Sequence, residues 1–423
     1  MIVDRSPFRH SPLTRRGGMS VRDHSLHVGG AGRYAEGVND ETRNDAPSPA
    51  DQVLDPSAEP ATPEQPHPGA RVSTDPADHP RNFGSDNWAG AHPEVIQALI
   101  DANVGHTPGY GGDPWTAHFH AVMEGHFGAR AQAYPVFNGT GANVLALQSA
   151  LPRWAAVITA ASAHINYDET GAPEKVGGLK IVAVPTADGK LTPESIASAM
   201  VGRGSEHNAQ PLAVSISQST EWGTTYRPEE IRAIADHAHA NGMILHVDGS
   251  RLGNAAAFLG TDLAALTTDV GVDILSLGGT KNGLLAAEAV IVLNPEIGQG
   301  MRFLRKMNLQ LSSKMRFLSA QLNALYDGQL WRTSADHANA MARYLETGLA
   351  EVAASGRVPG LELVQPVEAN VVFVRMPAEV AARARQRFAF ADWPLERDIV
   401  RLMCAFDTTT DDVDALIAAI AGE

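Results

Sequence analysis

The sequence of this chain predicts an α/β protein with a large, mostly parallel β-sheet covered by helices. From residue 82 onwards, short apolar runs rich in β-branched residues alternate with segments of helical pattern. Such alternation is typical of parallel strands joined by helices. After about residue 300 the alternation stops, and a long helical stretch precedes a few short strands. We therefore expect a second, smaller α+β domain at the C-terminus.

The strands expected in the large sheet are short apolar runs bounded by turn-forming residues. They cover residues 133–137, 156–160, 180–184, 213–217, 243–247, 273–277 and 289–293. Between them, residues 142–151 and 228–240 have the spacing of amphipathic helices. In the C-terminal part, helical spacing over residues 315–326 and 334–354 precedes expected strands at 370–375 and near 400–405.

The first 80 residues differ in composition from the rest of the chain. They are rich in Pro, Asp, Ser, Gly and Arg and contain few large apolar residues. Such a segment buries too little apolar surface to offset the entropy lost on ordering. We expect residues 1–80 to be a disordered tail, residues 81–300 a large domain, and residues 301–423 a small domain.

The bulk properties narrow the class of protein. The formal net charge of −15 disfavours a general nucleic-acid or anionic-membrane binder. The single cysteine, Cys404, excludes an intrachain disulfide and a cysteine-rich zinc site, and we predict no metal site. No run approaches the length of a membrane span, and no apolar stretch follows the N-terminal arginines. We expect a cytoplasmic enzyme that acts on a small molecule.

The first motif with chemical content is FNGTGAN, residues 137–143, which lies between an expected strand and an expected helix. Free backbone N–H groups and the helix dipole at such a start suit a phosphate group. Gly139 and Gly141 allow close approach of the backbone, and Thr140 adds a hydroxyl donor. The motif is neither a P-loop nor a dinucleotide fingerprint, so it favours a phosphate monoester over ATP or NAD. A plain structural turn is the alternative.

The second motif places Asp248 at the end of the strand expected at residues 243–247. Ligand sites of open α/β sheets lie at this edge. A buried carboxylate there needs a cationic partner or several hydrogen-bond donors. Asp248 is therefore either a helix cap or ion-pair partner of Arg251, or a carboxylate that keeps the pyridine nitrogen of a cofactor protonated.

The third motif contains Lys281 in a glycine-rich turn after the strand expected at residues 273–277. Most lysines are solvated and have no chemical role. Burial beside apolar strands lowers the pKa of an ammonium group and favours a nucleophilic amine. The order of phosphate turn, strand-end aspartate and lysine is far more specific than any of the three alone.

The fourth motif contains His164, which follows the strand expected at residues 156–160. A lone histidine is usually structural or exposed. At this edge of the sheet, an imidazole can also stack on a planar cofactor or act as a base near neutral pH.

Together these motifs resemble the low-specificity L-threonine aldolase and phenylserine aldolase family, within the fold-type I enzymes that use pyridoxal 5′-phosphate (PLP). This family borders the β-eliminating lyases. The resemblance covers roughly residues 82–410. It rests on NFGSDN (82–87), YGGD (110–113), NGTGAN (138–143), AHINYDE (163–169), GSR (249–251), GTKNG (279–283), SKMRF (313–317) and RLMCAFD (401–407).

The resemblance implies an aspartate-aminotransferase-like fold with PLP bound in the large domain. Lys281 matches the lysine that forms a Schiff base with the cofactor, and Asp248 matches the partner of the pyridinium nitrogen. His164 matches the histidine stacked on the ring. Gly139 and Thr140 match the phosphate cradle.

The resemblance also implies how the substrate is held. Ser85, Arg251 and Arg401 match groups that bind the substrate carboxylate, and Arg251 counts among the cofactor-binding residues too. Tyr110 lies near a subunit boundary in such enzymes, whose active sites form between two chains of a homodimer, often paired into a homotetramer.

The implied reaction is PLP-dependent cleavage of the Cα–Cβ bond of L-threonine or a related β-hydroxy-α-amino acid, such as phenylserine, to glycine and an aldehyde. The chain departs from several family members in SQSTEWG (217–223), where they carry a second histidine. The base for the β-hydroxyl group is therefore His164, Glu221 or an ordered water. The alternatives are a PLP-dependent β-eliminating lyase, a non-enzymatic PLP-binding homologue, and an α/β scaffold whose motifs are coincidental.

Overall fold

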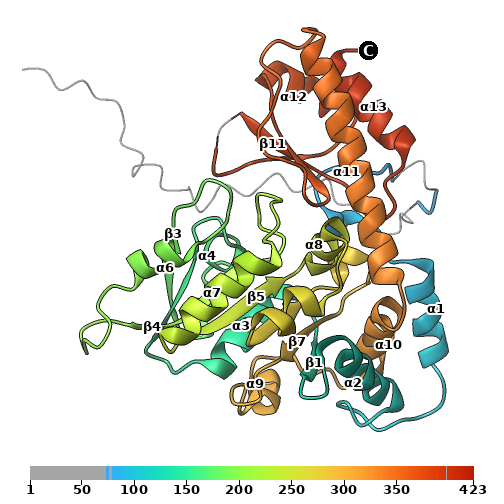
Figure 1. The fold of residues 1–423 in the computed structure, drawn as a ribbon. Helices are drawn as coiled ribbons and strands as arrows, with labels where there is room; N and C mark the ends of the chain where they lie inside the picture. The colour runs from blue at the N-terminus through green and yellow to red at the C-terminus, as the bar shows by residue number, and fades with distance from the viewer. Residues whose placement is uncertain (1–72, 76–78, 397) are drawn as a thin grey trace, which may run out of the picture. The chain divides into compact units, whose positions relative to one another are not determined.

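A seven-stranded sheet forms the centre of the larger part of the chain in this computed structural model (Figure 1). The structure describes residues 73–75, 79–396 and 398–423. The chain divides into two units after Val72, and the second contains both β-sheets. The tail expected for residues 1–80 lies outside the described residues, apart from 73–75 and 79–80.

The strand order of this sheet is β1-β7-β6-β5-β4-β2-β3, and all its strands except β7 run in one direction. The mostly parallel sheet is thus confirmed. Strands β2, β6 and β7 are buried along their whole length, as expected for strands covered on both faces. The strands are β1 (Gln132–Val136), β2 (Ala155–Ala160), β3 (Lys180–Val184), β4 (Gln210–Ser217), β5 (Ile244–Gly249), β6 (Ile274–Leu277) and β7 (Glu288–Val292).

The helices around this sheet begin at local start signals. Proline occupies the first turn of several helices, and the side chains of Asp113, Asn138 and Thr192 accept backbone N–H groups as N-caps. The helices are α1 (Pro93–Ala102), α2 (Pro114–Phe127), α3 (Gly139–Ala150), α4 (His164–Tyr167), α5 (Ala172–Lys175), α6 (Pro193–Ala199), α7 (Pro228–Ala240), α8 (Leu252–Leu259), α9 (Met301–Met307) and α10 (Met315–Tyr326). Among the residues that the structure describes, the single 3₁₀ turns are η3 (Asp86–Trp88), η4 (Ala264–Leu266), η5 (Thr268–Val270) and η6 (Thr280–Asn282).

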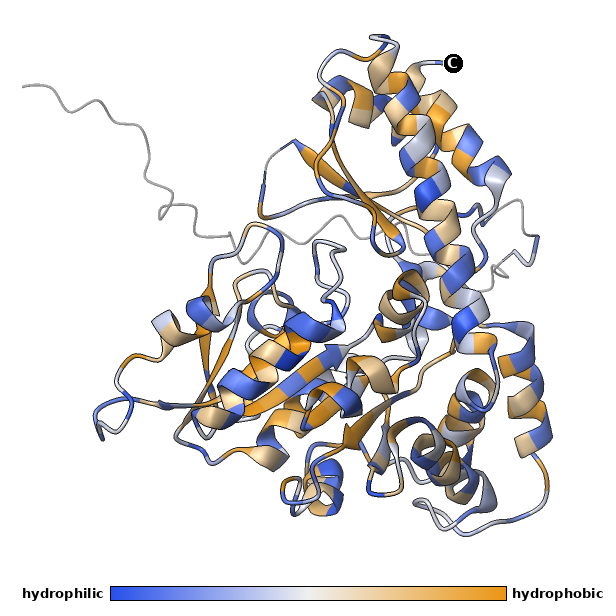
Figure 2. Cartoon of the chain, viewed as in Figure 1, coloured by the Kyte–Doolittle hydropathy of each residue, from blue (hydrophilic) through white to orange (hydrophobic). Residues whose placement is uncertain are grey.

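The C-terminal part contains a second, antiparallel sheet of four strands in the order β10-β11-β9-β8. Helix α11 has buried residues every three or four positions, and Figure 2 shows the polar residues between them. The expected α+β composition of the C-terminal part is thus confirmed. Its elements are α11 (Leu330–Ala354), β8 (Glu362–Leu363), β9 (Val371–Arg375), α12 (Ala378–Ala384), β10 (Ala391–Asp392), β11 (Ile399–Met403) and α13 (Thr410–Ala421).

Two large apolar cores correspond to the two sheets. The first includes Met315, Leu322 and Tyr326 of α10 and extends to Trp331, whereas the second takes its helix α11 residues from Ala342 onwards. Helix α10 lies after residue 300 but packs in the core of the large sheet. The domain boundary expected near residue 300 stays a prediction. Within the described ranges, no helix is long and apolar enough to span a membrane.

Candidate active site

One edge of the large sheet carries a cavity of about 370 Å³. It lies after strands β1, β2, β5 and β6 and before β7, which runs in the opposite direction. Ligand sites of open α/β sheets lie at this edge, and the volume suits a small molecule. Four predicted site residues are among its lining, which consists of Asn87, Phe137, Asn138, Gly139, Thr140, Asn143, His164, Glu169, Ser250, Thr280, Lys281, Ala286 and Glu288.

Asp248 lies buried at the end of β5, beside this cavity. Its Oδ2 accepts a hydrogen bond from Asn143 Nδ2 at 2.8 Å, and its Oδ1 accepts from the Ser250 backbone N–H and hydroxyl at 3.0 and 2.6 Å. Burial opposes ionisation, but Lys281, His164 and these hydrogen bonds outweigh it and lower the pKa of Asp248 to about 2. Asp248 is therefore an anion at neutral pH, as a carboxylate that keeps a pyridine nitrogen protonated must be.

The phosphate turn forms the start of helix α3, as predicted. Asn138 caps the helix, since its Oδ1 accepts the Gly141 N–H at 2.7 Å. A Cβ at Gly141 would lie 2.5 Å from the Gln310 amide group, so only glycine fits there without displacing that side chain. The Gly139 and Thr140 N–H groups lie in the first turn of α3, where no intrahelical acceptor is available. The turn can therefore bind an anion.

Lys281 lies in the 3₁₀ turn η6, which follows β6. The turn is held from outside: the Tyr326 hydroxyl donates to the Gly278 carbonyl, Asn282 Nδ2 donates to the Trp331 carbonyl at 2.9 Å, and Gln321 accepts two N–H groups just beyond. Burial and nearby Arg251 lower the pKa of Lys281. Its Nζ makes no hydrogen bond or ion pair with the described residues, so the amine is available to react.

His164 begins helix α4, and its ring is linked to Asp248 through two other side chains. Its Nδ1 lies 2.8 Å from Glu169 Oε1, which also accepts from Asn143 Nδ2 at 2.9 Å. The same Asn143 nitrogen donates to Asp248. Burial lowers the pKa of His164, but the hydrogen bond to Glu169 and the charge of Asp248 raise it overall, despite opposition from Lys281.

Glu221 is in contact with the backbone of His164 and is not part of the cavity lining. Its Oε1 accepts the His164 backbone N–H at 2.9 Å and the Ser217 hydroxyl at 2.6 Å. Burial raises the pKa of Glu221. In this position Glu221 fixes the backbone of His164.

Arg251, Arg401 and Ser85 come together near the N-terminal end of the described chain. Arg251 donates Nε and Nη2 to the two oxygens of buried Asp86 at 2.8 and 2.9 Å, so it pairs with Asp86 and not with Asp248. Arg401 Nη2 donates to the Gly84 carbonyl at 3.2 Å, while its buried Nε has no partner in the described part of the chain. Ser85 Oγ accepts the Asn87 N–H at 3.1 Å and caps η3.

Four buried polar residues of the site received no role from the sequence. Asn143 and Glu169 link the predicted histidine and aspartate, Asp86 pairs with Arg251, and Glu288 lines the cavity beside Lys281. The sequence motifs that carry the family resemblance contain Asn143, Glu169 and Asp86, so these motifs could have pointed to them. Glu288 stands at the start of the apolar run of β7, where a charged residue is unusual.

The residues around the cavity fit PLP. Asn143 Oδ1 and Glu169 Oε2 are buried without a hydrogen-bond partner among the described residues, which leaves polar capacity beside the cavity. The α3 turn can bind a phosphate, Lys281 offers an amine, and Asp248 offers an anion. These groups match the phosphate, aldehyde and ring nitrogen of that cofactor.

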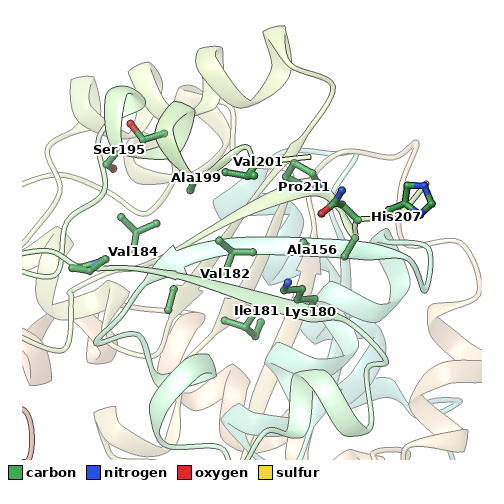
Figure 3. A pocket seen from close by; sticks show the side chains of 15 residues that line it. Ala156, Lys180, Ile181, Val182, Val184, Ser195, Ala199, Val201, His207 and Pro211 are labelled. Atoms are coloured by element: carbon green, nitrogen blue, oxygen red, sulfur yellow. The ribbon is translucent and has the colours of Figure 1, made fainter. Parts of the chain in front are cut away.

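A second hollow, of about 610 Å³, lies between edge strand β3 and helix α6. Only Lys180 and His207 among its lining side chains can carry a charge, and both lie at one end (Figure 3). It lacks the converging acids, bases and nucleophile of the first cavity, so the smaller cavity is the candidate active site.

Known proteins resemble this chain over most of its length. The beta-eliminating lyase family model matches residues 82–379. The low specificity L-threonine aldolase of Pseudomonas aeruginosa is 40% identical over 346 residues, which cover 80% of this chain and 96% of that protein. The enzyme of the same name from a Pseudomonas species is 39% identical over 352 residues, with coverages of 81% and 98%.

Solved structures show the same relationship. A threonine aldolase of Leishmania major superposes with a TM-score of 0.75 at 30% identity, covering 81% of this chain and 98% of that one. The aspartate aminotransferase of Thermus thermophilus superposes with a TM-score of 0.60 at 16% identity, covering 81% and 91%, which shows a common fold.

Proposed function

This chain belongs to the β-eliminating lyase family of PLP-dependent enzymes, and on that premise we propose that it is an aldolase for L-threonine or related β-hydroxy-α-amino acids, phenylserine among them. The products are glycine and an aldehyde. The observation that carries the proposal is the hydrogen-bonded path from His164 through Glu169 and Asn143 to Asp248, which borders the same cavity as Lys281.

The residues of this path suit the chemistry that PLP brings. Bound PLP supplies an electron sink conjugated to the substrate Cα. Asp248 keeps the ring nitrogen protonated and so maintains that sink, while Lys281 provides the covalent attachment. Gly139 and Thr140 at the start of α3 hold the phosphate. His164 covers the ring from the cavity wall.

The substrate carboxylate binds near Arg251 and Arg401, which differ in how far their charges are already balanced. The charge of Arg251 is already balanced by Asp86, with which it forms a buried bidentate pair. Arg401 has a buried Nε without a partner in the described part of the chain. Arg401 therefore supplies the uncompensated positive charge, and Arg251 and Ser85 supply further donors. Fixing the carboxylate orients the Cα–Cβ bond, which is a large contribution to the rate.

His164 Nε2 is the base that takes the proton from the β-hydroxyl group of the substrate. Of the candidates, His164 lines the cavity, whereas Glu221 lies outside it and is committed to the His164 backbone. The Glu169 carboxylate holds His164 Nδ1, which orients Nε2 and raises its basicity.

We also propose that two copies of the chain form a homodimer that shares its active sites, and that the enzyme works in the cytoplasm. The side chains of Phe303, Met307 and Leu309 are 72%, 63% and 84% exposed, and Tyr110 is 56% exposed with Lys306 over its ring at 5.3 Å. Such apolar exposure is typical of an interface. Light scattering coupled to size exclusion measures the mass; a Leu309→Asp variant of unchanged mass would refute this dimer surface.

The test of the activity is a product assay. Purified holoenzyme is given L-threonine and L-phenylserine, and glycine is measured with the aldehyde. Release of glycine from either substrate is expected, and Lys281→Ala should abolish it. If neither releases glycine while another amino acid yields ammonia and an α-keto acid, the chain is a β-eliminating lyase with the same site.

A further inference from the structure

Glu288 is a buried carboxylate in contact with the lysine turn. It is the first residue of β7, is 7% exposed, and lines the cavity with Thr280 and Lys281. The Gly279 backbone N–H donates to its Oε2, and the Thr280 N–H donates to its Oε1 at 3.3 Å. Both oxygens of Glu288 thus hold the two residues that precede Lys281.

The lysine turn also packs closely against the start of β7. A Cβ at Gly279 would lie 2.4 Å from the Ala287 carbonyl oxygen, so the turn packs directly on the chain that leads into Glu288. This approach depends on β7 running against its neighbours, because its first residue then lies at the edge where β6 ends. The backbone conformation just before Lys281 therefore depends in part on Glu288.

Glu288 also differs in charge balance from the other carboxylates near Lys281. Asp86 is paired with Arg251, and Asp248 is committed to the cofactor nitrogen under the proposed function. Glu288 has no ion pair within 4 Å among the described residues, and Lys281 is the cation that affects it. The titratable or charged groups around Glu288 and Lys281 are Asp86, Asp248, His164, Arg251 and Tyr326.

We propose that Glu288 is the positioning residue of Lys281, holding the lysine turn through its backbone and supplying the negative charge that balances the Lys281 ammonium. This proposal rests on the proposed function for the role of Lys281. Burial raises the pKa of Glu288 to about 7 against the hydrogen bonds from Thr280 and Gly279 and the charge of Lys281. The Glu288 carboxylate is therefore fully charged only above about pH 7, where it opposes loss of the Lys281 proton.

The direct test measures Lys281 in the apoprotein. Competitive acetylation with acetic anhydride, read by mass spectrometry of the peptide containing Lys281, gives the pH midpoint of the amine. Glu288→Gln removes the balancing charge, so the ammonium is less stable and the midpoint should fall by about one pH unit. Glu288→Asp keeps the charge and should restore most of the midpoint.

The matched control is Asp273→Asn. Asp273 is also buried, accepts the Leu245 N–H at 2.8 Å, and stands just before β6, at the opposite end of that strand from the lysine turn. Its substitution should lower the melting temperature and leave the Lys281 midpoint unchanged. If the role of Glu288 were purely structural, Glu288→Gln would also lower the melting temperature and leave the Lys281 midpoint unchanged.

Two results overturn the inference: a Glu288→Gln midpoint equal to or above that of the unsubstituted protein, or a Glu288→Asp midpoint no closer to it than that of Glu288→Gln. The pH titration of the visible absorption band of the holoenzyme repeats the comparison with cofactor bound. If neither the unsubstituted protein nor any variant forms that band, the proposed function is wrong. The Lys281 midpoints of the apoproteins still decide the role of Glu288.

Discussion

His246 makes the stability of the folded protein depend on pH. It lies on β5, two residues before Asp248, and is fully buried. Its Nδ1 lies 2.8 Å from Ser215 Oγ and its Nε2 3.0 Å from Ser276 Oγ. Burial lowers the pKa of His246 from 6.5 to about 4, although the charge of Asp248 acts in the opposite direction. The folded protein therefore keeps this imidazole neutral.

The magnitude follows from proton linkage. Between pH 6.5 and pH 4 the unfolded chain binds a proton at His246 that the folded chain does not. The contribution to stability is present above pH 6.5 and is lost as the pH falls toward 4. From pH 7 to pH 5, this one group should lower the free energy of unfolding by about 2 kcal/mol.

The assay compares urea denaturation of the unsubstituted protein and His246→Gln at pH 7 and pH 5. The free energy of unfolding of the unsubstituted protein should fall by about 2 kcal/mol more than that of the variant. The effect of the substitution itself on the free energy of unfolding cancels, because each protein at pH 5 is compared with the same protein at pH 7. His207→Gln, at an exposed position, should keep the full pH dependence. If His246→Gln loses as much stability as the unsubstituted protein, the linkage argument is wrong.

Three further predictions concern the site. Gly141→Ala should weaken PLP binding measured by fluorescence titration, because its Cβ displaces Gln310; a second substitution, Gln310→Ala, should restore binding, and no restoration would refute the clash. Asp86→Asn leaves Arg251 buried and unpaired, so the free energy of unfolding in urea should fall by about 3 kcal/mol or more; a loss below about 1 kcal/mol contradicts this. His164→Asn should lower kcat about 100-fold or more in the glycine assay, and an unchanged kcat would exclude His164 as the base.

Much of the fold could be predicted because its signals are local. The ranges expected at residues 180–184, 228–240 and 315–326 match the observed elements, since apolar spacing and capping residues act within a few positions. The site edge could be predicted for a similar reason. Asp248 lies at the end of one apolar strand and Lys281 follows another, and parallel strands end at one edge of a sheet.

What the sequence by itself determined is therefore the scaffold, the cavity edge and the residues that each strand delivers to it. Only the tertiary structure decided which polar groups pair there. Arg251 pairs with Asp86, 165 positions away in the chain, and not with Asp248, three positions away. Glu288 reaches the lysine turn because β7 reverses direction. Partner choice among buried charges depends on desolvation and geometry across distant segments, which no local pattern in the chain encodes.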